Sequence, residues 1–200
     1  MKTLKQFINK SLVKSDYINE GIINIKDYRR LIKPHVTPKD RKELRLIVKD
    51  TIEKEGNRCD LNFIDTSKIT NMNGLFANSK FNGDISKWDV SNVTDMGSMF
   101  YGSAFNGDIS KWNVANVKDM FWMFCASKFN GNISKWDVSK VENMWRMFAN
   151  SKFNGDISKW DISNKAEITV MFSNSLLEKT YGRTPSIDKD GHFVNIKHIK

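Results

Sequence analysis

Residues 81–90 read Phe-Asn-Gly-Asp-Ile-Ser-Lys-Trp-Asp-Val, and this stretch returns with few changes at residues 105–114, 129–138 and 153–162. Downstream of each copy, methionine keeps the same 24-residue interval, at Met99, Met123, Met147 and Met171. A fixed short period indicates similar units stacked on one another, and not a globular core folded around one pocket. The sequence therefore favours a protein that presents a long surface, and it argues against an enzyme.

The pattern inside one copy predicts a strand, a turn and a short helix. Asn-Gly-Asp at residues 82–84 marks a turn, and residues 86–90 alternate in the way that is typical of a strand. The apolar residues of 93–100 follow helical spacing. Residues 57–80 form a weaker first copy, in which Ile64 replaces the tryptophan. We therefore predict an α/β solenoid, a leucine-rich-repeat-like right-handed coil of about five 24-residue strand–helix repeats.

A solenoid needs a cap at its first coil, because an open end exposes the core and unpaired backbone. A helix is expected there over residues 38–55. Thr37 is a suitable N-cap, Pro38 suits the first helical position, and Gly56 is a suitable stop.

The expected organisation has three parts. Residues 1–56 form an N-terminal helical segment and cap, residues 57–176 form the repeat solenoid, and residues 177–200 form a C-terminal cap. The first part is expected to include a short amphipathic helix at residues 4–12. The last is expected to include a closing strand at residues 193–199.

Charge is distributed unevenly along the chain, whose net charge is +9. Residues 1–56 carry 14 Lys and Arg against 8 Asp and Glu, whereas residues 57–176 carry 13 against 12. A repeat that binds nucleic acid would carry positive charge along its body. Nucleic acid is therefore not the expected partner, and binding of an anionic surface through the basic flanks is a weaker alternative.

Cysteine usage and the N-terminus bear on the compartment. Cys59 and Cys125 occupy different positions of the repeat, so no disulfide is expected between them. Residues 1–10 lack the continuous apolar run of a secretory signal, and no run approaches the length of a membrane span. The chain as written is therefore expected to be cytoplasmic or associated with a particle.

Residues 88–100, followed by 104–106, resemble the repeat of the BspA-like leucine-rich repeat surface proteins, which is often described as a domain of unknown function. The approach to the first copy, residues 42–56 and 65–70, is also similar to that family. The resemblance covers about residues 38–176. It implies a leucine-rich-repeat-like solenoid and an interaction role, since relatives are commonly cell-surface proteins that bind host proteins or other cells.

The chain departs from that family in its ends. The sequence as written shows no signal-peptide, lipid-attachment or wall-anchor pattern, so surface display is not expected from it. The opening residues 1–8 are similar in style to leader helices on many proteins of gut-bacterial phages. That second resemblance implies an intracellular or virion-associated protein.

Three rows of the repeat have a structural explanation. The tryptophan row is expected to lie in the core, and it consists of Trp88, Trp112, Trp136 and Trp160. A row of turn residues is expected to cap turns and not to bind calcium, and it consists of Asp84, Asp108, Asn132 and Asp156. A lysine ladder is expected to face outward, and it consists of Lys87, Lys111, Lys135 and Lys159. The ladder either solubilises the surface, offset by neighbouring acids, or forms a concave site for acidic ligands.

The positions that break the repeat are the candidates for a partner site. Between the core positions of the predicted helix, aromatic and cationic residues gather in adjacent copies: Tyr101, Phe121, Trp122, Trp145 and Arg146. Trp and Arg dominate interface hot spots, and Arg146 is expected to lie over Trp122. The alternative is that these side chains fill gaps between successive helices.

These observations lead to a non-catalytic protein-interaction scaffold whose protein partner the sequence does not name. One alternative is a structural or virion-associated component docked through its basic N-terminal segment. No catalytic, metal-binding or cofactor-binding motif is present, and the three histidines have no ligand spacing.

Overall fold

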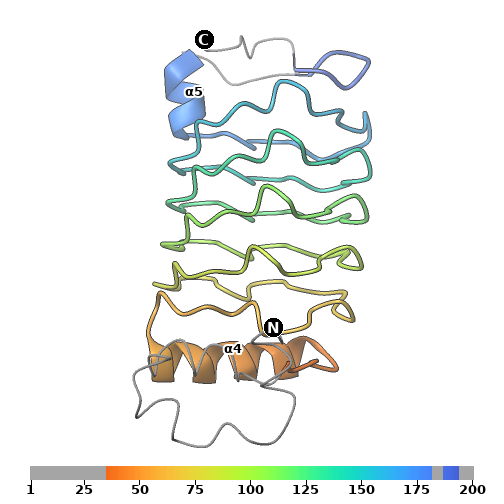
Figure 1. Cartoon of the computed structure of the whole chain (residues 1–200). Coiled ribbons are helices and arrows are strands. Elements are labelled where there is room, and N and C mark those ends of the chain that lie inside the picture. The colour runs from red at the N-terminus through yellow and green to blue at the C-terminus, as the bar shows by residue number, and fades with distance from the viewer. Residues whose placement is uncertain (1–34, 182–186, 194–200) are drawn as a thin grey trace, which may run out of the picture. The chain divides into compact units, whose positions relative to one another are not determined.

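The computed structural model describes residues 35–181 and 187–193. It divides the chain into two compact units, residues 1–36 and residues 37–200. The second unit has α4 (Arg41–Glu55) at one end, a stack of coils after it, and α5 (Leu176–Tyr181) where the stack finishes (Figure 1). The helix expected at residues 4–12 lies outside the described residues.

The stack follows the 24-residue period of the sequence. We number as coils 1 to 5 the residues 57–80, 81–104, 105–128, 129–152 and 153–176. Isolated parallel bridges join equivalent residues of successive coils, and the longest row of them runs through Asn71, Asp95, Asp119, Asn143 and Glu167.

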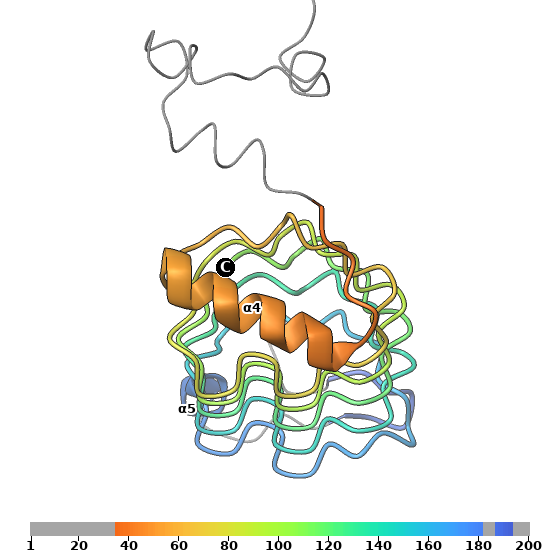
Figure 2. The same cartoon turned by 90° about the horizontal axis from the view of Figure 1, so that it is seen from below.

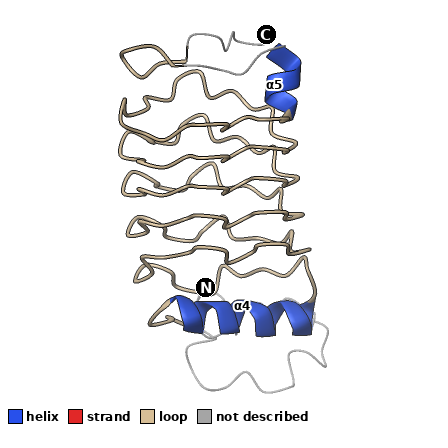
Figure 3. Cartoon of the chain, turned by 180° about the vertical axis from the view of Figure 1, so that it is seen from behind, coloured by secondary structure: helices blue, strands red, loops and turns tan. Residues whose placement is uncertain are grey.

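The prediction of an α/β solenoid with strand–helix repeats is wrong. Outside α4 and α5, the described residues form no helix and no strand, and Figure 3 draws all the coils as loops and turns. Neither the strand expected at residues 86–90 nor the helix expected at 93–100 is present. Consecutive turns take the place of both elements.

Tight turns explain why the helical spacing was misleading. The Val93 N–H donates to the Val90 carbonyl (2.9 Å), and the Met99 N–H donates to the Met96 carbonyl (3.2 Å). A β-turn brings its first and fourth residues together, so both can point into the core. An i, i+3 apolar pair is therefore satisfied by a turn as well as by one face of a helix.

Short polar side chains hold these turns. In coil 2, three aspartates each accept a hydrogen bond from the backbone N–H two residues ahead, at 2.9 Å. They are Asp84, Asp89 and Asp95. Such local bonds offer the backbone an alternative to helix or sheet, and they recur in each coil.

A left-handed residue in each coil also prevents a helix. The third residue of the turn that begins at Met96 is Ser98, with φ 55°, and its equivalents are Trp122 (53°), Arg146 (54°) and Val170 (48°). Coil 1 has Gly74 (63°) at this position. A side chain in this region costs roughly 1–2 kcal/mol, so it is stable only where the surrounding contacts impose it.

Identical residues stack on one another in the core. The rings of Phe100 and Phe124 lie 5.6 Å apart, and Phe100 also stacks on Phe105 at 4.5 Å. The predicted core position of the tryptophan row is confirmed, because all four side chains are buried. Each indole N–H reaches a carbonyl of the preceding coil, as Trp136 does to Ile109 (3.2 Å). Burial without such a partner would be costly.

Helix α4 caps coil 1 and crosses the end of the stack (Figure 2). The expected cap is confirmed, but its first residue differs. The N-cap is Asp40, whose carboxylate accepts the Glu43 N–H (2.8 Å), while Glu43 accepts the Lys39 N–H (3.0 Å). This reciprocal capping box starts the helix three residues later than Thr37 would.

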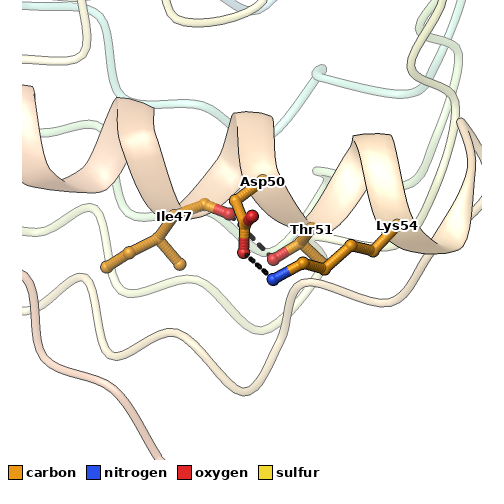
Figure 4. A network of polar contacts seen from close by, with 4 residues as sticks. All are labelled: Ile47, Asp50, Thr51 and Lys54. Carbon is orange, nitrogen blue, oxygen red and sulfur yellow. Dashed lines mark hydrogen bonds and ion pairs between the residues drawn. The ribbon is translucent and has the colours of Figure 1, made fainter.

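Buried and exposed faces of α4 are distinct. Leu44 and Val48 are buried against coil 1. Figure 4 shows the last turns of the helix, where the Thr51 hydroxyl donates to the Ile47 carbonyl (2.8 Å) and Lys54 pairs with Asp50 (2.8 Å). The hydrogen bond to Ile47 satisfies the buried threonine hydroxyl within the helix itself.

The other end of the stack is closed differently from the expectation. Helix α5 was not predicted, although Ser175 and Glu178 have capping-box spacing and the Glu178 N–H donates to the Ser175 hydroxyl (3.0 Å). Ile187 and Phe193 form an antiparallel bridge. Of the strand expected at residues 193–199, only Phe193 lies within the described residues, and it packs edge-on against Phe172.

Candidate functional site

Four of the five candidate residues, all except Tyr101, lie at the tips of equivalent turns in coils 3 and 4. This turn column consists of the second and third residues of the turns that begin at Met72, Met96, Met120, Met144 and Ile168. Its members are Asn73 and Gly74, Gly97 and Ser98, Phe121 and Trp122, Trp145 and Arg146, and Thr169 and Val170. A turn tip points away from the two inward-facing residues that close it. Most of these side chains are accordingly half-buried or exposed.

Three aromatic side chains form a continuous stack across coils 2, 3 and 4. The Tyr101 and Trp122 rings lie 5.3 Å apart at 22°, and the Trp122 and Trp145 rings lie 5.6 Å apart at 19°. We call these three residues the aromatic ladder. All three are half-buried, unlike the fully buried phenylalanine rows. The structure thus brings together residues that the sequence places 44 positions apart.

Arg146 lies at the end of the aromatic ladder, but over a different ring from the one expected. Its guanidinium carbon is 5.0 Å from the centroid of Trp145, the adjacent residue, and not over Trp122. Trp122 is already stacked between Tyr101 and Trp145, so its faces are occupied. Arg146 as a residue is exposed.

Phe121 has a partly structural role. Its ring lies over Gly97, where an added Cβ would be 2.3 Å from a Phe121 ring carbon. The same ring is tilted by 46° against Trp122, with the centroids 6.4 Å apart. Phe121 therefore fills the space left by the missing side chain of Gly97. For this residue, the alternative that the side chains breaking the repeat fill gaps in the fold applies.

Backbone groups under the aromatic ladder are fully used. The Trp122 N–H donates to the Trp145 carbonyl (3.0 Å), and the Arg146 N–H donates to the Thr169 carbonyl (3.3 Å). The Trp122 carbonyl accepts the Cys125 N–H (3.1 Å). Because these hydrogen bonds join coils 3, 4 and 5, they stiffen the backbone that carries Trp122 and Trp145.

The position of Tyr101 does not face outward in every coil. Its equivalents Cys125 and Ala149 are buried, with 5% and 2% of their surface exposed. Burial raises the pKa of the Cys125 thiol, and the nearby Arg146 charge opposes that rise to a smaller extent. The sequence left open whether this position faces outward or toward a neighbouring helix, and the structure buries it in coils 3 and 4.

The lysine ladder is exposed, as expected. None of its four members, Lys87, Lys111, Lys135 and Lys159, forms an ion pair with another of the described residues. The acids expected to offset them serve their own turns. Asp137, for example, accepts hydrogen bonds from the hydroxyl and the N–H of Ser139, which lower its pKa.

The turn-capping role of the row that starts at Asp84 is confirmed. Asp84, Asp108 and Asn132 each accept the N–H two residues ahead, at 2.9 to 3.0 Å. The N–H of Ser110, followed by its hydroxyl, lowers the pKa of Asp108, with a smaller effect from Lys111. Within the described part of the chain, no three His, Cys, Asp or Glu side chains are grouped to hold a metal ion.

Val170 belongs to this surface but was not selected from the sequence. It occupies the turn-column position of Trp122 and Arg146 in coil 5, and it is 38% exposed. Its left-handed φ of 48° is unfavourable for a β-branched residue. The 24-residue spacing already makes Val170 equivalent to Trp122 and Arg146, but an aliphatic residue gives no sequence signal for a partner site.

A family model described as "Mycoplasma protein of unknown function, DUF285" matches residues 47–148 and also residues 123–180. Together these matches cover more than half of the chain and extend from the middle of α4 through coil 5. No curated protein and no solved structure matches the chain. Among the helices of the described residues, none has the length and apolar character needed to cross a membrane.

Proposed function

We propose that this chain, which belongs to the Mycoplasma protein family of unknown function DUF285, is a non-catalytic scaffold that binds a protein partner. The observation that carries the proposal is the aromatic ladder with Arg146 at its end. Tryptophan, tyrosine and arginine account for most strong interface contacts, and here they share one face. Elsewhere in the turn column, the repeat uses Asn73, Gly74 and Thr169 at the same positions.

The conformation of the site supports this reading. Trp122 and Arg146 have positive φ at a position where glycine is least strained and where coil 1 has Gly74. Large side chains in a strained conformation are often found at functional sites, where binding and not stability accounts for them. The fold itself does not require either residue, because coils 1 and 5 close the same turn without them.

We also propose kinship with the BspA-like repeat surface proteins. The Trp-Asp-Val-Ser-Asn-Val stretch at residues 88–93 and the Met-Phe pair at 99–100 support this relationship. Relatives of that kind commonly bind host proteins or other cells, so the partner of this chain would be a protein on another surface.

The test exchanges residues between coils. Trp145→Thr combined with Arg146→Val copies the pair Thr169 and Val170 of coil 5 into coil 4, so the turn keeps a side-chain pair that the fold already accepts. Lys135→Gln on the same coil is the matched surface control. Immobilised wild type, the exchanged variant and the control are compared for proteins captured from the producing cells and from host cells.

We expect at least one protein to bind the wild type and the Lys135→Gln control, and to bind the exchanged variant about tenfold or more weakly, as for a hot spot. Unchanged capture by a folded exchanged variant would contradict the proposal. If capture were then lost on removal of residues 1–36, the binding function would belong to the basic N-terminal segment.

A further inference from the structure

We infer that the aromatic ladder and Arg146 bind an acidic, extended segment of the partner, an inference that rests on the proposed function. Some groups of this surface already bind other groups of the chain, and others have no partner among the described residues.

Ring faces are used within the aromatic ladder itself. Tyr101, Trp122 and Trp145 stack at 5.3 and 5.6 Å, and the guanidinium of Arg146 lies 5.0 Å from the Trp145 ring. A sugar ring or a proline needs an open aromatic face, and the central ring, Trp122, is stacked on both of its neighbours. The ladder instead presents ring edges, which carry the positive end of the aromatic quadrupole and attract oxygen acceptors.

Arg146 is a cation without a carboxylate. Within residues 35–181 and 187–193 it forms no ion pair, whereas Lys118, in the preceding coil, pairs with Glu142 at 3.3 Å. Stacking on Trp145 restricts the guanidinium before any partner arrives. A restricted planar guanidinium loses little entropy when it binds a carboxylate in bidentate fashion.

In coils 4 and 5, the backbone of the turn column has one N–H, and no carbonyl, without a partner among the described residues. The carbonyls of Trp145 and Thr169 accept hydrogen bonds from the preceding coil, and those of Arg146 and Val170 accept hydrogen bonds from their own coils. The Val170 N–H corresponds to the N–H groups of Trp122 and Arg146, which donate to the following coil. No acceptor among the described residues receives it.

Three kinds of group on this face therefore lack a partner among the described residues, namely ring edges, the Arg146 guanidinium and the Val170 N–H. All three attract oxygen acceptors. A second copy of this chain, docked through the same face, would place donors against donors. A segment rich in carboxylates and carbonyls, supplied by a different protein, satisfies all three.

The experiment uses the full chain and fluorescently labelled oligoglutamate, oligoglutamine and oligoproline peptides of one length. Affinity is measured by fluorescence anisotropy for the wild type, Arg146→Gln and Lys135→Gln. The two variants lose the same charge from coil 4, so long-range attraction to the basic chain falls equally in both. Position-resolved amide exchange of Val170, with and without oligoglutamate, locates the bound peptide.

We expect oligoglutamate to bind more tightly than the other two peptides. Arg146→Gln should weaken it about tenfold or more, since a charge-assisted pair is lost, and Lys135→Gln by about twofold or less. Amide exchange at Val170 should slow in the complex. Equal weakening by both variants, tighter binding of oligoproline, or unchanged exchange at Val170 would overturn the inference.

Failure of this inference is distinct from failure of the proposed function. If the peptides show no preference but capture of a partner still depends on Trp145 and Arg146, the scaffold proposal stands and only the partner's chemistry is wrong. If capture is independent of both residues, neither proposal holds.

Discussion

Replacing Trp122 with glycine should remove the centre of the binding surface at little cost in stability. Glycine occupies the same turn position in coil 1, as Gly74, with a φ of 63° against 53° for Trp122. The change therefore keeps a backbone conformation that the fold uses elsewhere. The variant therefore tests whether the Trp122 side chain serves binding or core packing.

Several terms favour the variant. Relief of the left-handed conformation of a bulky residue is worth about 1–2 kcal/mol. The Trp122 indole N–H is buried without a hydrogen-bond partner among the described residues, and its removal is worth about 1 kcal/mol. Together these gains amount to about 2–3 kcal/mol.

Other terms oppose the variant. Two stacked ring pairs, with Tyr101 and with Trp145, are lost at about 1 kcal/mol each. Exposure of the half-buried indole area costs about 2 kcal/mol, and the added freedom of glycine in the unfolded chain costs about 0.5 kcal/mol. The losses, about 4.5 kcal/mol together, exceed the gains by about 1.5–2.5 kcal/mol.

Trp136→Ala is the matched core control. Trp136 is 4% exposed, and its indole N–H donates to the Ile109 carbonyl, so the cost should be about 3–5 kcal/mol. Differential scanning calorimetry of the full chain should show a fall of a few degrees for Trp122→Gly and a much larger one for Trp136→Ala. An equal loss in the two variants would refute the reasoning and make Trp122 a core residue.

Two further predictions concern the ends and the turns of the stack. Gly191→Ala should destabilise the chain more than Gly56→Ala, although both have φ near +86°, because an added Cβ at Gly191 would lie 2.1 Å from a backbone carbonyl oxygen and nothing lies within 4 Å at Gly56. Equal shifts in calorimetry would show that the clash is relieved without cost. Asp137, whose pKa is lowered by Ser139, should stabilise the fold above the ordinary carboxyl range and lose that effect as pH falls through its folded pKa. The stability difference between wild type and Asp137→Asn should therefore disappear in acid, and a difference that persists there would contradict this origin.

The core could be predicted from the sequence because the recurrence of the same residue at a fixed interval has few explanations. A residue repeated every 24 positions must meet its own copies in a stack, and only apolar residues can do so throughout a core. Phe, Trp and Met rows were thus assignable before any coordinates. The helix α4 was also visible, because Thr37, Pro38 and Gly56 are local start and stop signals, even though its N-cap is Asp40 and not Thr37.

The local structure of a coil was not predictable in the same way. Val90, Val93, Met96 and Met99 are spaced for one face of a helix and equally for the ends of two tight turns. Hydrogen bonds between coils decided between these possibilities. The Met96 N–H, for example, pairs with the Asp119 carbonyl 23 residues further along the chain (2.9 Å), and no local pattern reports such a partner.

The candidate site divides along the same line. Sequence alone determined which residues break the repeat, and so which side chains the core does not need. Tertiary structure decided that Tyr101, Trp122 and Trp145 form one stack, that Arg146 lies over Trp145, and that Phe121 fills the gap at Gly97. The physical reason is that periodicity specifies which residues are equivalent, whereas ring contacts depend on the turn geometry and on the offset between neighbouring coils.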